Sequence, residues 1–67
     1  MNTAKAKIDA LTKEQIKEFR EKIMKCKTQY DQLVTAGRII SSLWILNWNG
    51  EDAKYLIRKC GVRLLMW

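Results

Sequence analysis

The first half of the chain shows a regular spacing of apolar residues. They recur at intervals of 3-4-3-4-3 positions and are Ile16, Phe19, Ile23, Cys26, Tyr30 and Leu33. Because an α-helix has about 3.6 residues per turn, this spacing places all six on one stripe. The pattern predicts a long amphipathic helix that runs to about Ala36. Gly37 would end it, since glycine readily adopts the left-handed conformation found after helices.

The start of this helix carries a specific local signal in "LTKEQI", residues 11–16. The hydroxyl of Thr12 can accept from the amide of Gln15, and the Gln15 side chain can accept from the amide of Thr12. Leu11 can pack on Ile16 as a hydrophobic staple. We therefore place the helix start at Thr12, and we expect residues 1–10, which contain lysines, to form a flexible basic arm.

The second element, residues 38–49, is apolar nearly all round. As a helix it would place Ile39, Leu43 and Leu46 on one side, with Ile40, Trp44 and Trp48 continuing round from it. As a strand it would be apolar on both faces, and its β-branched and aromatic residues allow that alternative. Both interpretations predict burial, and we favour a helix.

A third helix is expected after Asn49, which can cap it, with Glu51 and Asp52 in its first turn where acidic groups suit the helix dipole. Its apolar face would consist of Ala53, Leu56, Ile57 and Cys60. Gly61 would close it. The alternative is a two-residue hairpin turn at Asn49-Gly50, but "EDAKYLIRK" alternates poorly as a strand.

The chain ends with the apolar segment "VRLLMW", residues 62–67, which we expect to dock on another surface and not to fray into water. It can continue as a short helix or as a strand. The expected fold class is therefore mainly α: one small three-helix domain over residues 1–67, with a long first helix and an apolar C-terminal tail. The alternative is an α+β fold with a short two-stranded sheet from residues 42–48 and 62–67.

The amino-acid composition limits the kinds of binding or catalytic site that the chain can form. The 67 residues include two cysteines, Cys26 and Cys60, and no histidine, so a structural zinc site has too few ligands and no metal or cofactor is expected. Two cysteines fit reduced thiols in a cytoplasmic protein better than a disulfide scaffold, although one bridge between them is left open. No signal-peptide pattern and no apolar run of membrane-spanning length occurs. Without a histidine base, a glycine-rich phosphate loop or an activated nucleophile, we expect no enzyme activity.

The net charge of +6 favours encounters with acidic surfaces. The basic residues expected to contact a partner are Lys22, Lys25, Lys27, Arg38, Lys54, Arg58, Lys59 and Arg63. The expected aromatic anchors are Trp44, Trp48 and Trp67. Both groups also have a purely structural explanation. Glu18 with Lys22, and Glu21 with Lys25, have the spacing of ion pairs on a solvated helix surface. The tryptophans can be core residues.

A core in a chain this small supplies only about 3–5 kcal/mol, which favours assembly with a partner. The first and third helices cannot cover all the large apolar residues of the second half, so part of the apolar surface is expected to remain exposed. We therefore expect a non-catalytic protein that binds a larger protein or nucleoprotein with an acidic surface, and regulates or inhibits it by occupying that surface. One alternative is a small DNA-binding transcriptional regulator that acts as a dimer. Another is a structural subunit of an assembly. Self-pairing through the long helix is disfavoured, because Lys22 would face Lys27.

Overall fold

The computed structural model describes residues 4–44 and 48–66. These residues form four helices: α1 (Ala4–Asp9), α2 (Lys13–Met24), α3 (Gln29–Trp44) and α4 (Gly50–Lys59). Neither described range contains a strand, so the mainly α class is confirmed. The alternative sheet is wrong, because residues 42–44 belong to α3 and residues 62–66 follow α4 without forming a strand. Residues 45–47 and 67 of that proposed sheet lie outside the described residues.

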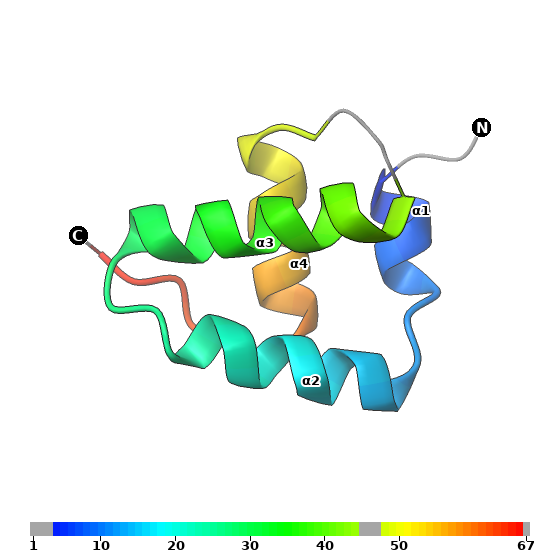
Figure 1. Ribbon diagram of the computed structural model, residues 1–67, viewed down its shortest axis with the longest axis horizontal. Coiled ribbons are helices and arrows are strands. Elements are labelled where there is room, and N and C mark those ends of the chain that lie inside the picture. The colour runs from blue at the N-terminus through cyan, green and yellow to red at the C-terminus, as the bar shows by residue number, and fades with distance from the viewer. Residues whose placement is uncertain (1–3, 45–47, 67) are drawn as a thin grey trace.

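The helices form two layers (Figure 1). Helices α2 and α3 run antiparallel beside each other, and α4 lies behind them and runs across the pair. Helix α4 packs against all three other helices, and most extensively against α3. The core lies around α4 and consists of Ile8, Phe19, Ile23, Ala36, Ile39, Ile40, Ala53, Leu56, Ile57 and Cys60.

The predicted start of α2 is confirmed. The Thr12 hydroxyl accepts from the Gln15 amide at 3.1 Å, and the Gln15 side chain accepts from the Thr12 amide at 3.0 Å. These two bonds satisfy amides that have no partner within the first helical turn. Phe19 and Ile23 of the predicted stripe are buried, so α2 rests on the core through the expected face.

The predicted single long helix is wrong, because residues 25–28 separate α2 from α3. The hydroxyl of Thr28 accepts from the amide of Asp31 at 3.1 Å, which satisfies one free amide at the start of α3. Gly37 does not end a helix; it lies within α3, which continues to Trp44. The separate helix expected at residues 38–49 is therefore wrong: residues 38–44 form the second half of α3, and residues 48 and 49 precede α4. Residues 45–47 of that expected helix lie outside the described residues.

The third predicted helix, α4, is confirmed at both ends. Asn49 and Asp52 form a reciprocal capping box, with the Asp52 amide donating to the Asn49 side chain at 3.0 Å. Gly61 has a φ of 76°, which only glycine adopts at little cost. The amides of Gly61 and Val62 donate to the carbonyls of Arg58 and Ile57, respectively, and so close the helix.

The flexible arm expected at residues 1–10 is wrong for residues 4–9, which form α1, and its residues 1–3 lie outside the described residues. Ile8 is fully buried in the core. The next residue, Asp9, accepts a hydrogen bond from the Tyr55 hydroxyl at 2.5 Å and lies 3.9 Å from the Lys59 ammonium. Helix α1 is thus attached to α4 by an apolar contact and by a polar one.

The segment after α4 docks along α3, as its apolar composition predicts. The buried side chain of Gln32 donates to the Arg63 carbonyl at 3.0 Å and accepts from the Leu65 amide at 2.8 Å. Gln29 donates to the Leu65 carbonyl at 3.1 Å. Val62 and Leu64 pack against the core. Gln29 and Gln32 therefore hold this tail beside α3 through hydrogen bonds to its backbone, and residues 62–66, the described part of the tail, form neither of the two elements expected for it, a short helix or a strand.

Candidate interaction surface

Most of the basic side chains form no ion pair with a described acidic residue. Among the described residues, which include all 13 lysines and arginines, only two ion pairs occur: Lys22 with Glu18 at 3.7 Å and Lys59 with Asp9 at 3.9 Å. The pair expected between Glu21 and Lys25 does not form within 4 Å. Eleven cations are thus left without a described carboxylate within that distance, and the surface is strongly positive.

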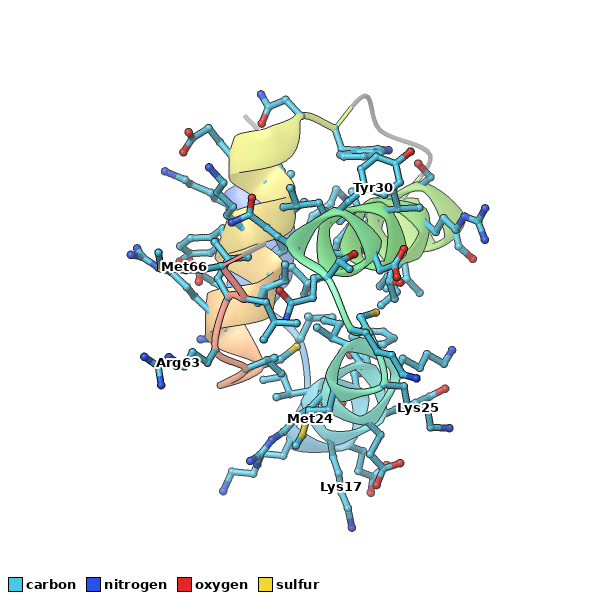
Figure 2. The ribbon with its side chains drawn as sticks, turned by 90° about the vertical axis from the view of Figure 1, so that its left-hand side faces the viewer. Lys17, Met24, Lys25, Tyr30, Arg63 and Met66 are labelled. Atoms are coloured by element: carbon cyan, nitrogen blue, oxygen red, sulfur yellow. The ribbon has the colours of Figure 1, made fainter. Side chains whose placement is uncertain are left out.

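Exposed apolar and basic side chains are spread over one end of the molecule, which Figure 2 views directly. We call this region the end face; it comprises Met24, Lys25, Lys27, Tyr30, Arg63 and Met66. Its three large side chains are well exposed: 60% for Met24, 73% for Tyr30 and 92% for Met66. None of its three cations pairs with a described carboxylate.

Local structure explains why these residues gather there. Met24 is the last residue of α2, Lys25 and Lys27 belong to the following turn, and Tyr30 lies in the first turn of α3. Gln32 holds the backbone between residues 63 and 65 beside this helix start. This region contains a cavity of about 560 Å³, which is lined by Lys27, Thr28, Gln29, Tyr30, Leu33 and Met66. The end face is therefore hollowed between the turn and the tail.

A second concave region lies between α2 and α3 and contains two other predicted residues, Lys22 and Arg38. Its volume is about 490 Å³, and its apolar lining includes Phe19, Ile39 and Leu43. Leu43 is 41% exposed. Lys22 is engaged by Glu18, so Arg38 is the only lining cation without a described carboxylate within 4 Å.

Helix α4 presents the remaining predicted cations. Lys54 and Arg58 lie one turn apart beside a pocket of about 380 Å³, which is also lined by Lys5, Glu51, Tyr55 and Leu64. Lys59, predicted with them, lies outside this lining and pairs with Asp9. The structure thus distributes the predicted basic residues over three separate regions.

The tryptophans occupy different environments. Trp44 is half-buried and packs against the core, whereas Trp48 is 38% exposed. Trp67 lies outside the described residues. The indole of Trp48 covers Gly37 on α3, so it is an anchor within the chain as well as a partly exposed side chain.

Sequence reasoning missed the apolar part of the end face. The uninterrupted stripe assigned Tyr30 to a buried position, but the break at residues 25–28 changes the helix axis and leaves it exposed. Met24 and Met66 belong to none of the periodic apolar patterns in the sequence. The pattern Thr28-x-x-Asp31 was the one local signal that indicated a new helix start.

The described residues contain no group of three or more His, Cys, Asp or Glu side chains arranged to hold a metal ion. Both cysteines are free: Cys26 lies 3.3 Å from the Thr35 hydroxyl, and burial raises the pKa of the Cys60 thiol. Within residues 4–44 and 48–66, no helix is both long enough and apolar enough to cross a bilayer.

Comparison with known proteins gives no relative: no family model, no curated protein sequence and no solved structure matches this chain at a significant level.

Proposed function

We propose that the protein is a non-catalytic binding module that docks its end face on an acidic, partly apolar surface of a larger protein or nucleoprotein. It regulates or inhibits this partner by occupying that surface. The observation that supports this proposal most strongly is the exposure of Met24, Tyr30 and Met66 beside three cations that have no described carboxylate within 4 Å.

The physical reason is the combination of the two kinds of side chain. Exposed methionines adapt their shape to a partner, and an exposed tyrosine buries a large area when it is covered. Each square ångström of apolar surface removed from water contributes about 25 cal/mol. Lysines and an arginine around these anchors speed the encounter with an acidic partner and disfavour pairing with a second copy of the same face.

The end face needs additional contacts to make a stable complex. A standard interface covers about 800 Å² on each partner, more than three anchor side chains provide. The groove between α2 and α3 offers further apolar surface at Phe19, Ile39 and Leu43. We propose that a partner held at the end face extends towards this groove.

Site-specific photo-crosslinking tests the proposal in the native cells. A photoreactive amino acid replaces Met66 in one variant and Ser41, an exposed residue in the second half of α3, in the control. We expect a discrete protein adduct from position 66 and a much weaker one from position 41. Equal adducts at both positions, or adducts with nucleic acid alone, would contradict the proposal.

A matched pair of charge variants tests the role of the cations. Lys25→Glu with Lys27→Glu changes the end face, whereas Lys13→Glu with Lys17→Glu makes the same change in net charge on exposed positions of α2. We expect the first pair to reduce the adduct at position 66 at least about tenfold, because repulsion replaces attraction at the interface. The second pair should reduce it much less.

A further inference from the structure

The pocket between α1, α4 and the tail gathers three cations from two helices. Lys5 comes from α1, and Lys54 and Arg58 come from α4, where they lie one turn apart. None of them has a described carboxylate within 4 Å. Like charges at the spacing of Lys54 and Arg58 repel each other, so the arrangement costs stability.

The acidic groups close to the pocket do not neutralise it. Glu51 lies in its lining but pairs with none of the three cations. Asp9 is occupied elsewhere, because it accepts from the Tyr55 hydroxyl and pairs with Lys59. The lining thus carries three positive charges against one negative charge.

Two features hold the pocket in shape. The ammonium of Lys5 lies over the Tyr55 ring, 5.6 Å from its centre, and this ring is fixed by the hydrogen bond to Asp9. A cation over an aromatic face is attracted by the ring electrons. On the other side, the half-buried Leu64 forms an apolar wall, because Gln32 anchors the backbone on both sides of it.

We propose that this pocket binds a phosphate group, with Lys5, Lys54 and Arg58 as the residues that contact it. Arginine donates to two phosphate oxygens at once, and lysine supplies a compact charge. A bound phosphate removes the repulsion between the three cations. The phosphate belongs either to a nucleic-acid backbone or to a small phosphorylated molecule, and the two sources share this chemistry.

The test is a titration of the full chain, followed by amide chemical shifts. The probes are inorganic phosphate and a short DNA duplex of unrelated sequence. Lys54→Gln with Arg58→Gln removes two of the three cations. The control, Lys13→Gln with Lys17→Gln, removes the same charge from two exposed lysines at the same spacing on α2.

With inorganic phosphate, we expect shifts at α4 and around Lys5, and binding roughly fivefold weaker in the α4 variant, since exposed charge pairs are individually weak. With DNA, we expect the slope of log affinity against log salt to fall by about one in that variant, the loss of one phosphate contact. The control should bind as the wild type does with either probe.

Phosphate binding without DNA binding would support the pocket and identify a small molecule as its source, whereas a changed DNA slope would identify a nucleic-acid backbone. The proposal fails if neither probe shifts the α4 amides, or if both double variants weaken binding equally. Phosphate binding at this pocket does not depend on the end face, because the variants that test it leave Lys25, Lys27 and Arg63 unchanged. Failure here therefore leaves the crosslinking result at position 66 unaffected.

Discussion

The indole of Trp48 lies directly against the backbone of Gly37, in the middle of α3. A Cβ atom built on Gly37 would overlap the six-membered ring of this indole. The close approach explains why a glycine stands in a helix interior, where it normally costs about 1 kcal/mol relative to alanine.

We expect Gly37→Ala to lower the free energy of unfolding by about 1 kcal/mol, because the cost of displacing the Trp48 ring exceeds the gain in helix propensity. In a Trp48→Ser background the same substitution should raise it by about 0.8 kcal/mol, since only the propensity effect is left. Urea unfolding followed by circular dichroism of the four proteins measures both values. The same effect in both backgrounds would show that the contact has no energetic role.

Gln32 is the residue that attaches the tail to α3. Gln32→Leu keeps a similar volume but removes two hydrogen bonds to the backbone of Arg63 and Leu65, so we expect a loss of about 2 kcal/mol. Hydrogen exchange at the Leu65 amide should become much faster. Gln29→Leu is the matched control: it removes one bond and should cost about 1 kcal/mol or less. Unchanged protection of Leu65 in Gln32→Leu would contradict this role.

The capping box of α2 predicts a simple stability effect. Thr12→Ala should cost about 1 kcal/mol, because the Gln15 amide loses its acceptor at the helix start. Thr12→Ser keeps the hydroxyl and should cost much less. Thermal unfolding of the two variants, at one protein concentration, separates the cap from the effect of the methyl group. Equal losses in both variants would rule out the cap as the cause.

Stability should fall at alkaline pH for two reasons. The hydrogen bond to Asp9, with smaller contributions from desolvation and the Asp9 charge, raises the pKa of Tyr55 above its ordinary value of 10.0. Burial raises the pKa of the Cys60 thiol above 9.0. In both cases the folded state holds the proton more tightly than the unfolded state. The stabilisation is therefore complete below the ordinary value and is lost as the pH rises through the folded pKa.

Urea midpoints measured from about pH 8 to pH 11 test this expectation. Tyr55→Phe should remove the part of the decline that begins near the tyrosine's ordinary pKa, and Cys60→Ala the part that begins near the thiol's. A pH profile identical to wild type in Tyr55→Phe would show that the bond to Asp9 contributes nothing to stability.

Much of the local structure follows from the sequence alone. The capping residues Thr12 and Asn49 and the closing Gly61 were all predicted, because each acts on amides or carbonyls within a few positions of itself. The basic character of the surface also follows from composition. The break at Thr28 was missed because the apolar spacing continues across it, although its capping pattern is local.

Only the tertiary structure decided the rest. Three contacts join residues from different helices, from the tail or from the residues before α4. Ile8 is buried in the core, Gln32 binds the tail, and Trp48 lies over Gly37. The end face and the α4 pocket arise in the same way, because Met66 lies beside the start of α3 in the first and Lys5 joins the cations of α4 in the second. Periodicity and caps act over one or two helical turns, whereas these contacts depend on how helices pack, and packing is set by the fit of whole side-chain surfaces.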